Sequence, residues 1–328
     1  MNKGPFLIVM LMMVSLASAQ SDYLIAYNVL VNGEKDDYDI FVMNPDGTGK
    51  RNITNNADVA WTYHAYEDTV FFISDRDTCK RCVYLYTMGM DGSNVRKVSN
   101  LRLEDSWMST RNEGADLVVS GRTSSENRRQ LFVIDVKTGN FEQITHEKGA
   151  LFRDPLFSPD GKQIVYVYKA DASNREVYED LYIMDADGKN PRRLTFYPKD
   201  DKTSKWHSYH AGPPKWNRKE NFITYQSWQN GKSSLYAVTP DGKKQWKLTN
   251  NQLNEGWHDW SPDGKWLAIE MYDKANTEFG IYLMNWKTKE VKKLTDPKDS
   301  RFQQAPVFLL KNSGVGSQDS AENENRRR

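Results

Sequence analysis

The sequence lacks the short motifs of several large enzyme classes. It contains no Gly-x-Ser-x-Gly nucleophile elbow, and no Gly-rich phosphate loop followed by Lys-Ser or Lys-Thr. Its charges nearly cancel, with 45 Lys and Arg against 44 Asp and Glu, so no nucleic acid is expected as a partner. Beyond the N-terminus, no apolar run is long enough to span a bilayer. We therefore expect neither nucleophilic hydrolysis, nor phosphate-loop chemistry, nor a membrane span.

Cysteine is scarce, and the two that occur, Cys79 and Cys82, form a single Cys-x-x-Cys pair. Such a pair can be a redox centre, half of a metal site or a disulfide. A redox cysteine is favoured by a helix N-terminus, whereas an expected strand, Val83 to Tyr86, follows this pair. A zinc site needs a second pair of ligands, which no neighbouring segment obviously supplies. In an exported protein the pattern favours a small disulfide across a loop tip.

The N-terminus has the pattern of a cleaved signal peptide over residues 1–19. Lys3 gives the basic start, Phe6 to Leu16 the apolar core, and Ala17 to Ala19 a small-residue cleavage site. A membrane anchor is the alternative, but the apolar run is short and polar sequence follows at once. We expect a mature protein that is periplasmic or secreted.

A repeated unit organises the rest of the chain. In each copy Ile or Leu opens an apolar strand, a turn follows, and Thr or Ser stands 14 positions after the first residue. The six copies are Ile40–Thr54, Leu85–Ser99, Leu131–Thr145, Leu181–Thr195, Leu235–Thr249 and Ile281–Thr295. Their starts are 45, 46, 50, 54 and 46 residues apart. A period near 45 in β-type sequence is typical of propeller blades.

Two further strands precede each copy, so each blade is expected to be a four-stranded antiparallel meander. Ser158-Pro159-Asp160-Gly161 and Ser261-Pro262-Asp263-Gly264 have the residues of tight turns between these strands. Only one strand, Tyr23 to Val31, precedes the first copy, and one, Ala305 to Leu310, follows the last. The sequence therefore predicts an all-β, six-bladed propeller over residues 20–310, closed by a C-terminal strand in the N-terminal blade. Residues 311–328 are expected to be a disordered tail.

Two features of the repeats have both a structural and a functional interpretation. Basic pairs such as Arg192-Arg193 and Lys292-Lys293 recur on the outermost strands. They could form a partner-binding belt, but charges on a free edge also discourage edge-to-edge aggregation, which we favour. The Asp-x-Asp-Gly turns suggest calcium loops, yet they lack the later ligands of an EF-hand, and turn formation explains them.

The repeats resemble those of the TolB-type six-bladed β-propeller. The resemblance rests on Phe157–Lys162, Phe72–Arg76 and Leu181–Gly188, and it covers roughly Ser21 to Leu310. It implies a periplasmic protein that binds lipoprotein or Tol-system partners. The family's additional N-terminal α/β domain has no room between Ala19 and Tyr23, so we expect the propeller alone. Related propellers occur in prolyl-oligopeptidase-type peptidases and in oligogalacturonate lyases, which use a channel-mouth metal held by His and Gln.

Polar residues cluster at the expected innermost strands, which line the central channel. Four of the five histidines lie at or near the starts of those strands. We expect one axial opening to be surrounded by His64, Arg153, Asp154, His210, His258 and Gln304. Such a ring could hold a metal, an anionic sugar or a peptide side chain, or it could simply hydrate the channel.

The sequence favours a non-catalytic scaffold that binds a protein or a glycan at this axial face. The alternative is a metal-assisted carbohydrate-active enzyme resembling the oligogalacturonate lyases. We expect a monomer, no cofactor and no assigned metal ligand, and no residue is assigned a catalytic role.

Overall fold

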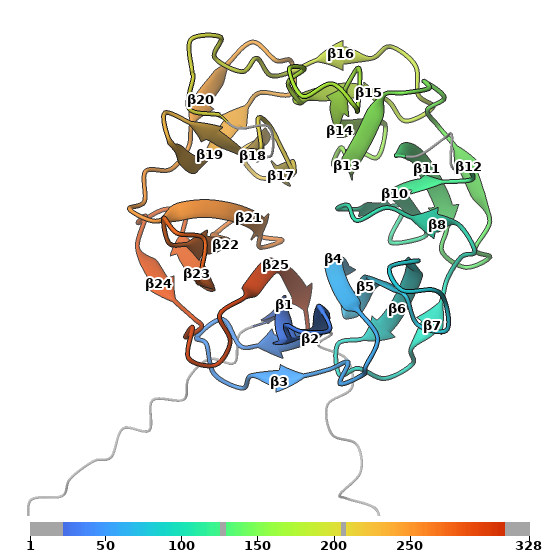
Figure 1. Ribbon diagram of the computed structural model, residues 1–328, viewed down its shortest axis with the longest axis vertical. Helices are drawn as coiled ribbons and strands as arrows, with labels where there is room; N and C mark the ends of the chain where they lie inside the picture. Colours follow the sequence, from blue (N-terminus) through green and yellow to red (C-terminus); the bar gives the residue numbers. More distant parts are fainter. Residues whose placement is uncertain (1–21, 125–128, 205–207, 312–328) are drawn as a thin grey trace, which may run out of the picture.

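The computed structural model describes residues 22–124, 129–204 and 208–311. The expected signal peptide and almost all of the expected tail lie outside these residues. Within them every regular element is a β-strand, and the strands form six sheets around a central axis (Figure 1). The prediction of an all-β, six-bladed propeller is confirmed. No helix in the described residues is long and apolar enough to cross a membrane.

The first three blades each run from an innermost strand at the axis to a short outermost strand. Blade 1 contains β25 (Gln303–Leu310), β1 (Tyr23–Asn32), β2 (Asp37–Met43) and β3 (Arg51–Asn52). Blade 2 contains β4 (Ala60–Tyr66), β5 (Thr69–Ser74), β6 (Tyr84–Gly89) and β7 (Arg96–Lys97). Blade 3 contains β8 (Arg102–Leu103), β9 (Ser109–Arg111), β10 (Asp116–Arg122), β11 (Gln130–Asp135) and β12 (Phe141–Gln143).

The last three blades are four-stranded in the same order. Blade 4 contains β13 (Leu151–Phe157), β14 (Gln163–Lys169), β15 (Asp180–Asp185) and β16 (Arg192–Arg193). Blade 5 contains β17 (Lys215–Asn217), β18 (Phe222–Gln229), β19 (Lys232–Val238) and β20 (Gln245–Lys247). Blade 6 contains β21 (Asn254–Trp260), β22 (Trp266–Tyr272), β23 (Phe279–Asn285) and β24 (Val291–Lys293).

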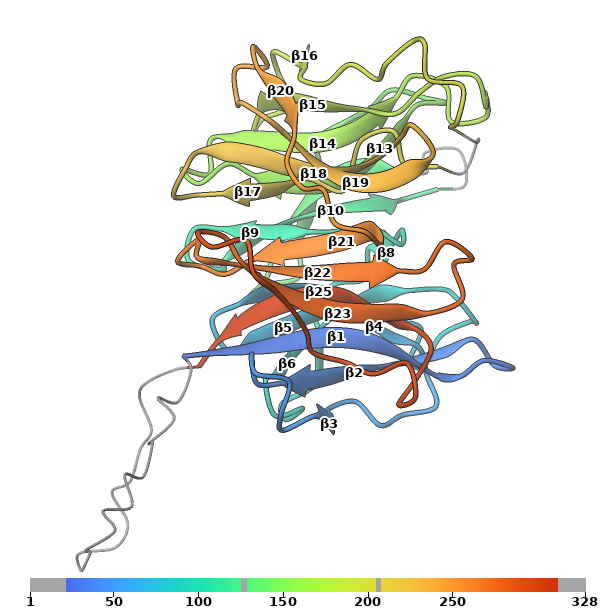
Figure 2. The same ribbon diagram turned by 90° about the vertical axis from the view of Figure 1, so that its left-hand side faces the viewer.

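The ring closes as the sequence predicts. β25 lies beside β1 at the axis, antiparallel to it, so blade 1 is built from both ends of the chain. The start of β1 and the end of β25 therefore lie at the same side of the molecule (Figure 2). This arrangement removes two open strand edges, which would otherwise offer unpaired N–H and C=O groups.

The Thr that ends five of the six repeats has a structural role. Leu181 N donates a 2.9 Å hydrogen bond to Thr195 Oγ1, which lies 14 positions later, beyond the outer hairpin. The same contact occurs at Ile40–Thr54, Leu131–Thr145, Leu235–Thr249 and Ile281–Thr295. The side chain satisfies a strand N–H that the two- or three-residue outer strand does not reach, which explains the constant spacing.

The innermost strands are irregular near their middles. Strand pairing shifts around Tyr63 in β4, between Arg153 and Leu156 in β13, and between Glu255 and His258 in β21. In blade 3 the innermost position is divided between β8 and β9. Bulges leave residues outside the ladder and turn them toward new neighbours. They are therefore the places where the strands send side chains into the channel or against the next blade.

Candidate functional site

A cavity of about 330 Å³ lies at the end of the channel toward which the innermost strands run. Its volume is at the lower end of the range of ligand pockets. All six blades contribute to its wall, because the last residues of the innermost strands converge there. One residue from each is Phe308, Tyr66, Thr110, Leu156, Trp216 and Trp260. We call this hollow the axial cavity.

The floor of the axial cavity carries a buried ion pair. Lys215 is 7% exposed, and its Nζ lies 3.1 Å from Asp259 Oδ1 and 3.9 Å from the ring centroid of Trp107. Asp259 Oδ2 also accepts a 2.9 Å hydrogen bond from the backbone N of Phe308. Burial lowers the pKa of Lys215, and the attraction of the Asp259 carboxylate offsets only part of that effect. Lys215 is thus a desolvated ammonium paired with one carboxylate of the lining.

His64 lines the same cavity, where its Nε2 lies 2.9 Å from Thr110 Oγ1 of the next blade. Desolvation lowers the pKa of His64 to about 3, and the nearby cations Lys215 and Arg218 act in the same direction. The ring is therefore neutral at physiological pH. Both charged groups that lower the pKa of His64 are cations of the cavity lining.

An aromatic cluster lies next to Lys215. Trp61, Tyr63, Trp107 and Trp257 come from blades 2, 3 and 6, and their ring centroids lie 5.2–6.4 Å apart. Such spacings are typical of edge-to-face and tilted packing. Lys215 contacts the Trp107 ring, so the cluster borders the axial cavity. It belongs to the hydrophobic core that blades 1, 2 and 3 share.

Arg153 and Asp154 lie between blades 3 and 4, where their side chains form ion pairs. Arg153 Nη1 contacts Asp154 Oδ2 at 2.5 Å, and its Nη2 contacts Glu179 Oε2 at 2.6 Å. Asp154 is 2% exposed, has a φ of 53°, and accepts a 3.0 Å hydrogen bond from the backbone N of Trp107. Its neighbour Ser106 both donates to this carboxylate and accepts from the Asp154 N–H. The arrangement ties the two blades together.

The side chains of His258 and His210 also contact residues of other segments. His258 is fully buried, and its Nε2 lies 2.7 Å from Thr224 Oγ1 of blade 5, which also accepts from Trp260 Nε1. Burial lowers the pKa of His258 to about 3, with Lys215 acting in the same direction. His210 stacks on Tyr178 with ring centroids 4.4 Å apart. Burial lowers the pKa of His210 as well.

The structure does not bring the six predicted residues around one opening. Of the six, only His64 lines the axial cavity. Gln304 stands near the start of β25, whereas the end of that strand reaches the cavity. Arg153 and Asp154 form one cluster with Glu179, whose charge also acts on His210, while His258 lies in a separate contact with Thr224. Most of these polar side chains join blades, and their role in binding stays a prediction.

Lys215, Arg218 and Asp259 are cavity residues that the sequence reasoning did not single out. The sequence nevertheless contains a pattern that could have identified Lys215 and Asp259. Lys215 directly precedes Trp216 in the three-residue strand β17, and Asp259 directly precedes Trp260, the last residue of β21. Side chains alternate along a strand, so the residue before a wall-forming aromatic is a candidate for the adjoining channel.

Cys79 and Cys82 are joined by a disulfide in the loop between β5 and β6. The backbone around it is held by Thr78 Oγ1, which donates to the carbonyl of Cys82 at 2.7 Å. In the described residues, no group of three or more His, Cys, Asp or Glu side chains is arranged to hold a metal ion.

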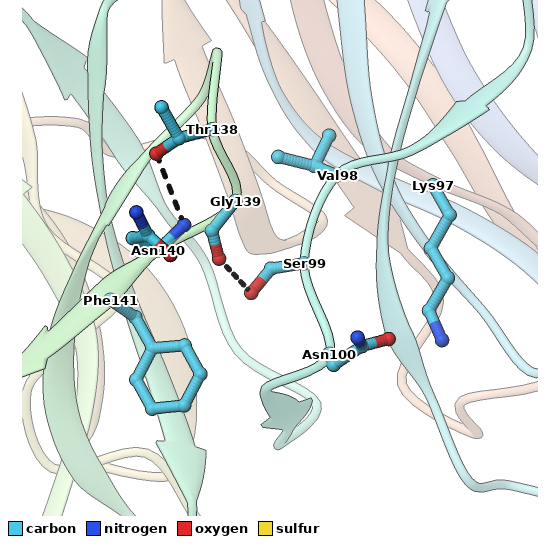
Figure 3. A pocket seen from close by; sticks show the side chains of 8 residues that line it. All are labelled: Lys97, Val98, Ser99, Asn100, Thr138, Gly139, Asn140 and Phe141. Carbon is cyan, nitrogen blue, oxygen red and sulfur yellow. Dashed lines mark hydrogen bonds between the residues drawn. The ribbon is translucent and has the colours of Figure 1, made fainter.

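A second hollow lies on the outer rim, between blades 2 and 3 (Figure 3). Ser99 Oγ donates a 2.7 Å hydrogen bond to the carbonyl of Gly139, whose φ is 76°. A Cβ on Gly139 would lie 2.2 Å from the carbonyl oxygen of Val98, so only glycine permits this approach. Gly92 and Gly188 approach the preceding blade in the same way. The hollow is therefore a product of repeat packing, which makes the axial cavity the better candidate site.

Comparison with known proteins agrees with the architecture. The family model of the TolB beta propeller domain matches residues 26–210. The Tol-Pal system protein TolB of Francisella tularensis subsp. mediasiatica is 29% identical over 82 residues. This alignment covers 25% of the present chain and 19% of the relative, so the match spans about a fifth of the curated relatives' length.

Solved structures show the same fold at low sequence identity. TolB from Acinetobacter baumannii superposes with a TM-score of 0.66 at 14% identity, over 87% of this chain and 66% of its own. The Nidogen/Laminin complex gives 0.61 at 10% identity, over 88% and 98%. An oligogalacturonate lyase in complex with manganese gives 0.53 at 14% identity, over 83% and 78%. At these identities the likeness shows the fold alone.

Proposed function

Because the chain belongs to the TolB β-propeller domain family, we propose that it is a non-catalytic scaffold that binds a partner protein at the axial cavity. The observation that supports this most is the construction of the cavity, to which all six blades contribute. Residues far apart in sequence meet there, so the cavity is a product of the closed ring as a whole.

The chemistry of the cavity suits a protein segment. Five of its lining side chains are aromatic: Tyr66, Phe157, Trp216, Trp260 and Phe308. Buried aromatic anchors next to a few charged groups are characteristic of binding hot spots. A glycan is the other ligand class that the sequence allows. Curated relatives are named as proteins of the Tol-Pal system, which favours a protein.

We further propose that the protein acts outside the cytoplasm as a monomer, periplasmic or secreted, after cleavage behind Ala19. The support is the pattern of Lys3, the apolar run to Leu16 and the small residues that follow. N-terminal sequencing of the protein from a cell fraction tests this. A mature chain that begins near Gln20 is the expected result, and an uncleaved chain in the cytoplasm would contradict it.

Site-specific photo-crosslinking tests the binding face. Pro262 is exposed and lines the cavity within a Ser-Pro-Asp-Gly turn. Pro240 stands in the matching Thr-Pro-Asp-Gly turn of an outer hairpin and provides the control. With p-benzoylphenylalanine at each position in turn, one protein, identified by mass spectrometry, should crosslink from Pro262 and not from Pro240. Crosslinking from Pro240 alone, or equally from both, would reject the axial face.

The alternative, a metal-assisted carbohydrate-active enzyme, stays a prediction from the sequence. The likeness to the manganese-bound lyase bears on the fold alone. Turnover of an oligogalacturonate that stops on replacement of His64 or His258 would favour it over the scaffold.

A further inference from the structure

The axial cavity combines an apolar wall with cationic groups at its floor and rim. Lys215 lies at the floor against Trp107, and Arg218 is an exposed lining residue on the same blade. Among the described residues, no ion pair or hydrogen bond involves the Arg218 side chain. Around these cations stand the five aromatic side chains named above. A ligand group that carries negative charge close to apolar surface would match these residues.

The lining also contains two carboxylates, Asp259 and Glu67, and the first is already engaged. Asp259 is already shared between Lys215 Nζ at 3.1 Å and the Phe308 N–H at 2.9 Å. Glu67 is exposed and lies at the rim beside Leu310. The backbone N–H of Leu310 donates a hydrogen bond to the backbone carbonyl of Glu67. His64 is neutral and can donate or accept a hydrogen bond but adds no charge. The lining cations are therefore Lys215 and Arg218. Of the lining carboxylates, Asp259 is already bonded to Lys215, and Glu67 lies at the solvent-exposed rim.

We propose that the axial cavity captures the C-terminal carboxylate of a peptide whose last residue is apolar. This inference rests on the proposed function and names the group that the partner inserts. The carboxylate lies between Lys215 and Arg218, and the terminal side chain packs on Trp216, Trp260 and Phe308. Hydrogen bonds between ionised partners are the strong ones, and exclusion of water strengthens them further.

The dimensions favour a chain end over a loop. A volume of about 330 Å³ accommodates the end of one chain, whereas a loop must bring two passes of backbone through the mouth. A terminal residue also carries its carboxylate and its side chain on the same Cα. It can therefore meet the cations and the aromatic wall together. A glutamate side chain reaches the cations but offers only two methylene groups to the wall.

Small probes test the proposal directly on the full chain. N-acetylphenylalanine and N-acetylphenylalaninamide have nearly the same shape and differ in the terminal charge. Binding is followed by ¹H–¹⁵N NMR of the tryptophan indole groups, because Trp216 and Trp260 line the cavity. The acid should bind at least about tenfold more tightly than the amide, as expected for loss of a charge-assisted hydrogen bond. Equal affinities, or no shift of these two signals with either probe, would overturn the proposal.

A third probe separates the two sources of a carboxylate. N-acetylisoglutamine has a free side-chain carboxylate and a blocked C-terminus. It should bind more weakly than N-acetylphenylalanine. If it binds more tightly, an acidic side chain is the natural ligand group and the terminal-carboxylate proposal is wrong.

Matched variants connect the affinity to the named cations. Arg218→Gln and Lys215→Met should each weaken the acid about fivefold or more and leave the amide unchanged. Lys219→Gln, at an exposed neighbouring position outside the lining, should change neither. Glu67→Gln should strengthen binding of the acid, because a like charge leaves the rim. Arg218 is exposed, so its variant remains informative even if Lys215→Met does not fold; an unchanged acid affinity in Arg218→Gln would overturn the assignment.

These results are distinguishable from failure of the proposed function. If Pro262 crosslinks a partner while acid and amide bind equally, the axial face binds a protein but not through a terminal carboxylate. If the acid binds selectively while no partner crosslinks at Pro262, the cavity is an anion site and the scaffold proposal fails.

Discussion

Tyr23, the first residue of β1, is paired with Leu310, the last residue of β25. The two ends of the described propeller are thus adjacent, and Lys311 N donates a 2.7 Å hydrogen bond to the carbonyl of Asp22. Leu310 also lines the axial cavity. Closure of the ring and construction of the candidate site therefore depend on the same strand.

Deletion of Arg301 to Arg328 should cause aggregation or a large fall in the thermal midpoint. The deletion removes β25 and exposes edges of β1, and it also removes the Phe308 N–H that Asp259 binds. Deletion of only Ser313 to Arg328 keeps every strand and serves as the control. Thermal melts monitored by circular dichroism give the comparison, and an ordinary melt for the longer deletion would refute closure by β25.

Asp154→Ala should lower the free energy of unfolding by about 1–3 kcal/mol, because it leaves Arg153 Nη1 and the Trp107 N–H without their buried acceptor, while Glu179 still pairs with Arg153 Nη2. Its 2% exposure and its inter-blade contacts argue for an effect on stability. Urea unfolding provides the measurement, with exposed Asp187→Ala as the control. Equal stability of the two variants would show that the contacts of Asp154 between blades 3 and 4 do not stabilise the fold.

The fold was predictable because its signal repeats. The residue pattern of Leu181 to Thr195 occurs six times in the chain, and each copy independently predicts a third strand, a turn and an outer strand. The bond from Leu181 N to Thr195 Oγ1 is local, so the sequence within one blade is sufficient to specify it.

The site was less predictable because its geometry depends on neighbouring blades. His64 and His258 occupy the same position relative to a following aromatic residue. His64 nevertheless contacts Thr110 of the next blade, whereas His258 contacts Thr224 of the preceding one. Lys215 and Asp259 come from β17 and β21 and meet only after the ring has formed. No spacing within the chain encodes that pairing.

Cys79 and Cys82 should be oxidised in the exported protein and should show no redox activity. Mass spectrometry without reductant should find the mass two hydrogens below that of the dithiol. The short loop limits the stabilising effect, so replacement of both residues with Ser should cost about 2 kcal/mol or less. Two thiols that react readily with an alkylating reagent in the native protein would contradict the prediction.

Glu270 should make the stability of the propeller fall as the pH rises. This residue of β22 is 4% exposed, and its Oε2 accepts a 3.1 Å hydrogen bond from the Ala305 N–H of β25. Burial raises the pKa of Glu270 to about 8. The titratable groups near it are the phenols of Tyr38 and Tyr272, whose own pKa values are raised mainly by burial. Neither can supply a positive charge to stabilise the carboxylate.

The sign follows from proton binding. Between about pH 4.5, the ordinary value for glutamate, and pH 8, the folded protein holds a proton that the unfolded chain has released. Stability contributed by this group is therefore fully present below the lower value and is lost as the pH approaches the upper one. Glu270→Gln keeps an acceptor for the Ala305 N–H and removes the titration. Each unit of pKa shift corresponds to about 1.4 kcal/mol, so the variant should gain at least that much over the parent between pH 5 and pH 8. Urea unfolding of both proteins across this range tests the prediction, and parallel pH profiles would show that Glu270 is ionised in the folded state.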